Sequence, residues 1–185
     1  KIINDNYFFL KNNYNKKNIF GNTLLMKACT TNNLYIVNHL LNIKSNVNMK
    51  NKSKNTALFG ASKNGHEKIL ERLFMEKINC NLINVFKQTS LMVACHNGYI
   101  NTVNLLLENN ANCNLQDIEG RTALMNASSC GNYNVIENIE KTNYYYMFQN
   151  QNKYINIINL LLINNTQCNL QDDNGYTALM IASIL

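Results

Sequence analysis

The fold is decided by a short stretch that reads DIEGRTALMNA, from Asp117 to Ala127. Its threonine recurs at intervals of thirty-three residues and then once more after fifty-five, at Thr23, Thr56, Thr89, Thr122 and Thr177. A leucine follows each of these threonines by two residues, and an alanine follows each by five. Self-similarity at such a period predicts stacked supersecondary units.

Each copy of the unit predicts two helices. Threonine is a favourable first residue for the first helix, because its hydroxyl can accept a hydrogen bond from an unpaired amide of the first turn. Apolar residues recur at helical spacing thirteen to eighteen residues after the threonine, as at Ile36, Val37, Leu40 and Leu41. This spacing places them on one face of a second, amphipathic helix.

Glycines mark the turns of the predicted unit. Three of them, Gly65, Gly98 and Gly131, stand nine residues after a threonine, where a left-handed residue can close the first helix. The first copy has Asn32 there, and asparagine tolerates the same conformation. Three others stand two residues before a threonine and predict tight hairpin-like turns: Gly21, Gly120 and Gly175.

These residues together resemble ankyrin repeats, whose pattern reads roughly D-x-x-G-x-T-P-L-H-x-A-A, then I-V-x-L-L-L, then A-x-V-N. The family's proline is replaced by Leu24, Ala57, Ser90, Ala123 and Ala178. Its histidine is replaced by Met26, Phe59, Met92, Met125 and Met180, which we expect to weaken local hydrogen bonding. The resemblance implies an all-α solenoid of stacked helix-turn-helix units that are linked by short β-hairpin-like turns.

We expect residues 1–185 to form a single domain. Its predicted parts are a half repeat at 1–17, repeats at 18–50, 51–83 and 84–116, a longer repeat at 117–171 and a half repeat at 172–185. Because both ends fall within a unit, we interpret the chain as a piece of a longer array. Its two ends are expected to expose apolar surface and therefore to fray or self-associate.

The longer repeat contains an insertion of twenty-two residues near 132–153. It carries Val135, Ile136 and Ile139 at helical spacing, followed by an aromatic run that includes Tyr144, Tyr145, Tyr146 and Phe148. One interpretation is an extra helix that folds back on its own repeat and is anchored by the aromatic residues. The other is a partner-binding finger, since tyrosine is enriched at interface hot spots.

Composition gives no sign of catalysis, a cofactor or a metal site. The three histidines, His39, His66 and His96, have no carboxylate or thiol at a catalytic spacing, and the six cysteines include no C-x-x-C pair. Five cysteines are expected to act as small hydrophobic packing groups: Cys29, Cys80, Cys95, Cys113 and Cys168. Cys130 is predicted in a turn, where its thiol could react. No apolar run reaches the length of a membrane span, and no secretory signal is visible. A cytoplasmic location is expected, with the nucleus left open.

Charge is uneven along the chain. Residues 1–63 contain ten lysines and a single acidic residue, whereas the remainder contains seven basic and ten acidic residues. Lys50, Lys52 and Lys54 are predicted to project from one hairpin tip, either as a basic patch that attracts an acidic partner or as a solvated face. No aromatic residues alternate with them, so nucleic acid is not an expected partner.

The resemblance implies a scaffold that binds one or more partner proteins through a concave surface of hairpins and first helices. The candidate contact residues are Lys50, Lys52, Lys63, Val85, Phe86, His96, Asn97, Ile118, Arg121 and Tyr176, with Ile19, Phe20, Ser53, Ile83, Asn64, Gln116 and Asp173 beside them. Val85 and Phe86 are the preferred anchors, although either could instead pack against a neighbouring hairpin. The alternative function is the regulatory segment of a larger enzyme, such as a protein kinase or a ubiquitin ligase.

Overall fold

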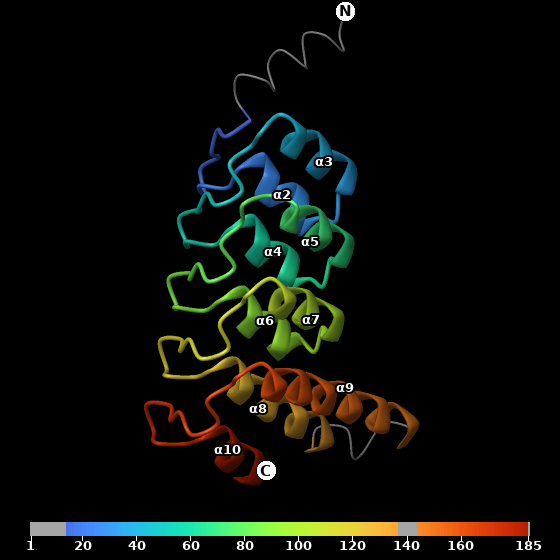
Figure 1. Ribbon diagram of the computed structural model, residues 1–185, viewed down its shortest axis with the longest axis vertical. Helices are drawn as coiled ribbons and strands as arrows, with labels where there is room; N and C mark the ends of the chain where they lie inside the picture. The colour runs from blue at the N-terminus through green and yellow to red at the C-terminus, as the bar shows by residue number, and fades with distance from the viewer. Residues whose placement is uncertain (1–13, 137–143, 185) are drawn as a thin grey trace, which may run out of the picture.

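The computed structural model describes the backbone of residues 14–136 and 144–184, and the side chains of residues 14–130 and 153–183. These residues form one elongated stack of helices (Figure 1). The helices are α2 (Leu24–Thr30), α3 (Leu34–Asn42), α4 (Ala57–Lys63), α5 (Glu67–Phe74), α6 (Ser90–Asn97), α7 (Ile100–Glu108), α8 (Ala123–Ile136), α9 (Tyr144–Ile163) and α10 (Ala178–Ile184). No strand occurs in these ranges, so the predicted all-α class is confirmed.

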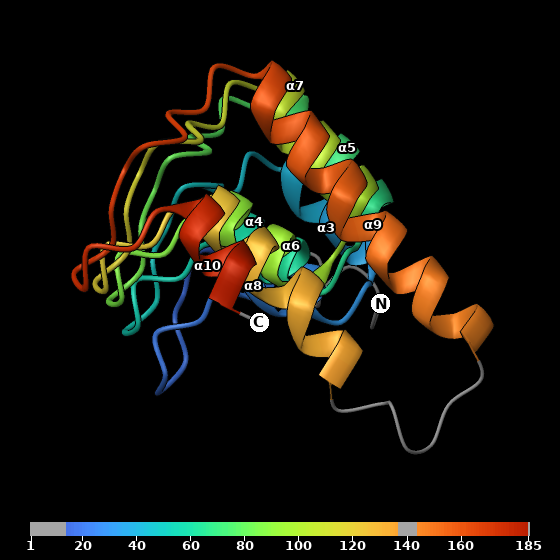
Figure 2. The same cartoon turned by 90° about the horizontal axis from the view of Figure 1, so that it is seen from below.

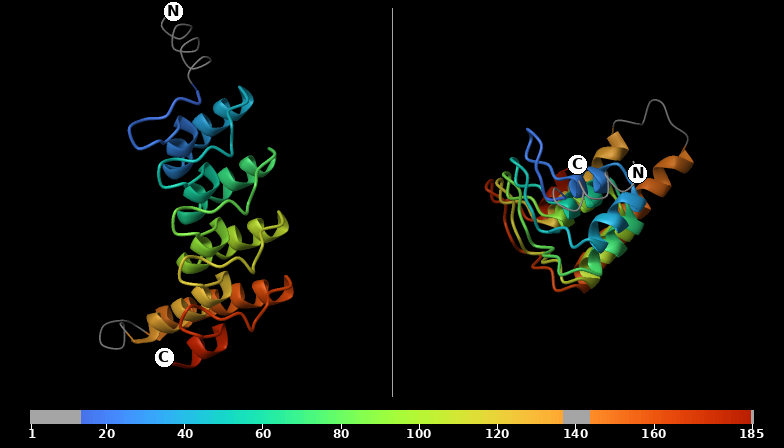
Figure 3. Two further views of the ribbon diagram at one scale, coloured as in Figure 1. Left: turned by 90° about the vertical axis from the view of Figure 1, so that its left-hand side faces the viewer. Right: turned by 90° about the horizontal axis from the view of Figure 1, so that it is seen from above.

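The helices lie in two layers. The first helices of the units, α2, α4, α6, α8 and α10, contact one another in order, and α3, α5, α7 and α9 form the second layer. The hairpin turns extend to one side of both layers (Figures 2 and 3). One hydrophobic core runs from Leu25 to Ala178, so neighbouring units share a continuous interior.

The threonines cap the first helices as predicted. Each hydroxyl accepts a hydrogen bond from the backbone N–H three residues later, with distances of 3.2–3.3 Å at Thr23, Thr56, Thr89, Thr122 and Thr177. The expected loss of hydrogen bonding at the methionines is wrong for three copies. The sulfurs of Met26, Met92 and Met125 accept the backbone N–H of their threonines at 3.4–3.5 Å, where they complete a capping box.

The turns confirm most of the predicted left-handed residues. Asn32, Gly65 and Gly98 have φ values of 55°, 67° and 71° between the two helices of their units. In two hairpins the place of the glycine is taken by Lys54 and Lys87, which have φ values of 60° and 55°. A side chain in this conformation costs about 1–2 kcal/mol. These two tips are therefore held by the surrounding structure against a local strain.

The described backbone of the insertion lengthens both helices of its own repeat, so it forms no extra helix in residues 132–136 and 144–153. The side chains on which the partner-binding interpretation depends lie outside the described residues, and that interpretation stays a prediction. Helix α8 has 14 residues and α9 has 20, whereas the earlier helices have seven to nine. Gly131 lies inside α8, so the predicted end of the first helix at this glycine is wrong. The backbone continues helical hydrogen bonding there, which outweighs the cost of about 1 kcal/mol for a helical glycine.

Hydrogen bonds between hairpins fix the spacing of the units. The backbone N–H of Lys52 donates to the Phe20 carbonyl at 3.2 Å, and that of Val85 donates to the Ser53 carbonyl at 3.0 Å. The N–H of Ile118 repeats this contact with the Phe86 carbonyl at 2.9 Å. The concave side of the stack is therefore a regular surface whose side chains project from positioned backbone.

Candidate partner-binding groove

Two adjoining pockets hollow the concave surface at the middle of the stack. The first, pocket A, has a volume of about 360 Å³ and is lined by Asn55, Phe59, Lys63, Asn84, Phe86, Gln88, Val93, His96 and Asn97. The second, pocket B, has a volume of about 200 Å³ and is lined by Phe86, Gln88, His96, Asp117, Ile118, Glu119, Arg121 and Asn126. The two pockets share Phe86, Gln88 and His96, and together we call them the groove.

Phe86 stands between the two pockets, and 57% of its surface is exposed. Its backbone N–H donates to Asn84 Oδ1 at 2.9 Å, and its carbonyl accepts the N–H of Ile118. Val85 beside it is also exposed. The backbone of both residues is held in place while their side chains are partly open to solvent, so neither is buried against a neighbouring hairpin. Their role as anchors stays a prediction.

His96 forms the wall between the pockets and is supported by the longer repeat. Its Nδ1 lies 3.2 Å from Cys130 Sγ, and its carbonyl accepts a hydrogen bond from the Tyr154 hydroxyl at 2.9 Å. Lys153 packs against Gly98 so closely that a Cβ there would clash. The described residues at the two ends of the insertion therefore support the part of the groove that His96 forms.

Polar groups line the rest of the groove. Asn97 Nδ2 donates to the Lys63 carbonyl at 2.9 Å, which joins the walls that α4 and α6 contribute. Asp117 Oδ1 accepts the backbone N–H groups of Glu119 and Arg121 at 3.0 and 2.9 Å and so shapes its own turn. Arg121 Nε lies 3.5 Å from Glu119 Oε2. These contacts fix the charged side of pocket B.

A family model described as ankyrin repeats (3 copies) matches residues 4–84 and 69–142, which is well over half of the chain. The chain belongs to the ankyrin-repeat family. A comparison with curated proteins found no match. Ankyrin repeats are generally protein–protein interaction modules, and domains of this family are typically non-catalytic scaffolds.

The remaining candidate contact residues of this ankyrin-repeat chain differ in their exposure and in their position relative to the groove. Lys52 and Tyr176 are exposed on hairpins outside the groove. Lys50 is half-buried, and its Nζ donates to the Ile83 carbonyl at 3.2 Å. The prediction that three lysines project from one tip is therefore wrong, because the Lys50 ammonium joins two hairpins. The side chains of Tyr144, Tyr145, Tyr146 and Phe148 lie outside the described residues, although their backbone begins α9.

Eight lining residues were absent from the sequence-based candidates: Asn55, Phe59, Asn84, Gln88, Val93, Asp117, Glu119 and Asn126. Their positions in the repeat could have identified half of them. Asn55 and Gln88 directly precede a threonine cap, and Val93 and Asn126 follow one by four residues. In an ankyrin unit these positions lie where the hairpin meets the first helix, so they face the groove when the neighbouring unit is stacked on them.

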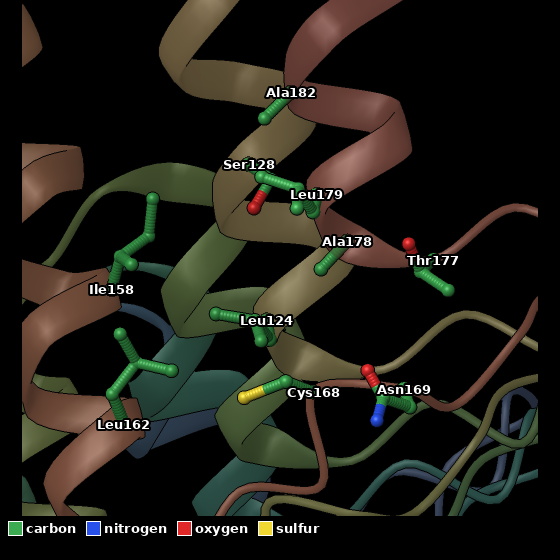
Figure 4. A pocket seen from close by; sticks show the side chains of 10 residues that line it. All are labelled: Leu124, Ser128, Ile158, Leu162, Cys168, Asn169, Thr177, Ala178, Leu179 and Ala182. Carbon is green, nitrogen blue, oxygen red and sulfur yellow. The ribbon is translucent and has the colours of Figure 1, made fainter.

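A third pocket, of about 350 Å³, lies at the carboxyl end of the ankyrin stack between α8, α9 and α10 (Figure 4). We call it the end pocket; it is lined by Leu124, Ser128, Ile158, Leu162, Cys168, Asn169, Thr177, Ala178, Leu179 and Ala182. Leu162 is 45% exposed here, whereas Leu41, at the same position of the first unit, is 1% exposed. In the earlier units this surface is covered by the next unit, so the end pocket has the character of a stacking surface.

The cysteines of this ankyrin chain are mostly packing groups. All six lie in the described part, none of them in a disulfide, and four are buried: Cys29, Cys80, Cys95 and Cys113. The expectation of a packing group is wrong for Cys168, which is exposed because it lines the end pocket. Burial raises the pKa of the Cys29 thiol to about 12, which keeps it protonated at neutral pH. Cys130 lies within α8, so its predicted place in a turn is wrong, and burial raises the pKa of its thiol too.

The described part of the chain has no group of three or more His, Cys, Asp or Glu side chains that could hold a metal ion. It also contains no helix that is long and apolar enough to cross a membrane. The groove itself presents an aromatic side chain, amides and a few charged groups.

Proposed function

We propose that this ankyrin-repeat chain is a scaffold that binds a partner protein through the groove, with Phe86 as the main anchor. The observation that carries the proposal is the exposure of Phe86 between two pockets while its backbone is hydrogen-bonded on both sides. A positioned aromatic side chain loses little conformational freedom on binding, and aromatic anchors dominate interface energetics.

The expected partner is a cytoplasmic protein. The chain's thiols, none of them in a disulfide, suit a reducing compartment. A nucleic-acid partner is not favoured, because the Lys50 ammonium is engaged with the Ile83 carbonyl and the basic patch at that tip is reduced to Lys52 and Lys54. Val85 and Ile118 extend the apolar contact area on either side of Phe86 and support a protein partner.

Phe86→Ala is expected to weaken partner binding by about thirtyfold, which corresponds to a hot-spot loss of about 2 kcal/mol. Partners would be identified by cross-linking to the wild-type chain, and each affinity would then be measured by titration calorimetry with the wild type and the variant. Tyr35→Ala is the matched control, because Tyr35 is 83% exposed on α3, away from the groove. Equal affinities of the wild type and Phe86→Ala, or equal losses in both variants, would refute the proposal.

We also infer that copies of this chain associate through the end pocket. Leu162, Leu179 and Met180 are exposed at this end, where apolar surface gains free energy from burial. Sedimentation velocity of the 185-residue chain is expected to show a coefficient that rises with protein concentration. The double variant Leu162→Lys, Leu179→Lys should remain monomeric at the same concentrations. A wild-type chain that sediments as a monomer throughout would rule this association out.

A further inference from the structure

The two halves of the groove differ in charge. Lys63 is the only Lys, Arg, Asp or Glu residue among those that line pocket A. Pocket B is lined by Asp117, Glu119 and Arg121, so it has one more anionic than cationic group. Glu119 also lies within ion-pair distance of Arg121, which partly neutralises the only cation there. A ligand that crosses both pockets therefore meets a positive end and a negative end.

The same polarity runs along the whole stack. The first two units, residues 18–83, contain eight lysines and one arginine against three glutamates. The last two hairpins carry Asp117, Glu119, Asp172 and Asp173 against Arg121 alone. Both the whole stack and the groove are therefore positive towards the first units and negative towards the last hairpins. An elongated ligand that carries opposite charges at its two ends is favoured in one orientation.

The middle of the groove offers amide groups in addition to Phe86. Gln88 Oε1 accepts a hydrogen bond from Asn84 Nδ2 at 3.2 Å, and Gln88 Nε2 has no partner among the described residues. The amide of Asn126 likewise forms no hydrogen bond within that part of the chain. Amide side chains can both donate and accept, which is what the main chain of an extended peptide requires of its binding surface.

The spacing of the units limits the length of such a ligand. Pocket A lies between the second and third units and pocket B between the third and fourth, so their centres are one unit apart. Packed helices are separated by about 8–10 Å, and an extended chain of the polyproline II type advances by about 3.1 Å per residue. It has about three residues per turn, so every third side chain lies on the same face. Two side chains that occupy the two pockets would therefore be about three residues apart.

We propose that the groove binds an extended peptide which places a carboxylate in pocket A, an apolar side chain against Phe86 and a cationic side chain in pocket B. This proposal rests on the proposed function, because it assumes that the groove is the binding surface. It adds the chemistry and the direction of the ligand. The acidic end of the peptide lies towards the first units, and the basic end lies towards the last hairpins.

The test is a selection from random decapeptides displayed on phage, with the whole chain as the immobilised target. Lys63→Glu and Lys68→Glu serve as parallel targets, because both make the same change in net charge. Lys68 is exposed on α5, in the outer layer of helices and outside the groove. Circular dichroism would establish that both variants keep the helical content of the wild type.

The wild type and Lys68→Glu are expected to enrich peptides with an acidic and a basic residue about three positions apart and an apolar residue between them. Lys63→Glu should lose the acidic preference. It should also bind a wild-type-selected peptide about fivefold more weakly in fluorescence polarisation, which is the upper range for one exposed ion pair. That loss should shrink at high salt, where exposed charges are screened.

Three results would overturn the proposal: enriched peptides without the charge order, identical behaviour of Lys63→Glu and Lys68→Glu, or no enrichment at all. None of these results changes the expected difference in partner affinity between the wild type and Phe86→Ala. That difference tests whether the groove is the binding surface. A failure of the peptide chemistry is therefore distinguishable from a failure of the scaffold function.

Discussion

Leu41→Ala is expected to lower the free energy of unfolding by about 3 kcal/mol, the middle of the range for buried leucine truncations. Leu41 lies in α3 with 1% of its surface exposed, and α3 packs against α5, the second helix of the next unit. Truncation removes apolar contacts and leaves a cavity that the surrounding helices can fill only in part. Because stability in a repeat stack resides largely in the contacts between neighbours, the first two units should separate more easily.

The matched control for this prediction is Leu162→Ala. Leu162 occupies the same position of the fourth unit but is 45% exposed at the end pocket. Its truncation should cost about 1 kcal/mol or less, since much of its surface stays in contact with water. Urea denaturation followed by circular dichroism measures both changes. Similar losses in the two variants would show that burial between units is not what stabilises the stack.

Much of the fold could be predicted from the sequence because its determinants are local and repeated. The threonine caps, the left-handed Asn32, Gly65 and Gly98, and the period of the apolar residues each follow from interactions within one unit or with the next. The longer repeat could not be predicted in the same way. Gly131 stands nine residues after its threonine, as Gly65 and Gly98 do, yet α8 continues through it. The end of the first helix is set here by the lengthened helices α8 and α9. Their additional residues are not part of the pattern that repeats.

The groove could be predicted only in part for a related reason. Phe86 and His96 were found because they occupy exposed positions of the repeat, and the structure brings them together at the boundary of two pockets. Lys50 occupies an equally exposed position in the sequence, but its ammonium reaches the Ile83 carbonyl of the next hairpin. Such contacts depend on which residue the neighbouring unit presents. The same holds for Cys130 and Tyr154, which support His96 from the longer repeat.

Ala94→Leu is expected to lower the melting temperature by roughly 4–8 °C, because overpacking of a core costs about 1–3 kcal/mol. Ala94 is fully buried in α6, which packs against α4, α7 and α8. A methyl group at this position lets the first helices approach closely, and a leucine would force them apart or adopt a strained rotamer. Differential scanning calorimetry measures the change.

Ala182→Leu is the position-matched control for this substitution. Ala182 follows Thr177 by five residues, as Ala94 follows Thr89, but it is exposed beside the end pocket. The same added atoms have room there and would cover part of an apolar surface, so we expect a melting temperature within about 1 °C of the wild type. If Ala94→Leu melts no lower than Ala182→Leu, close approach of the first helices is not required. The regular spacing that places the hairpins around the groove would then need another cause.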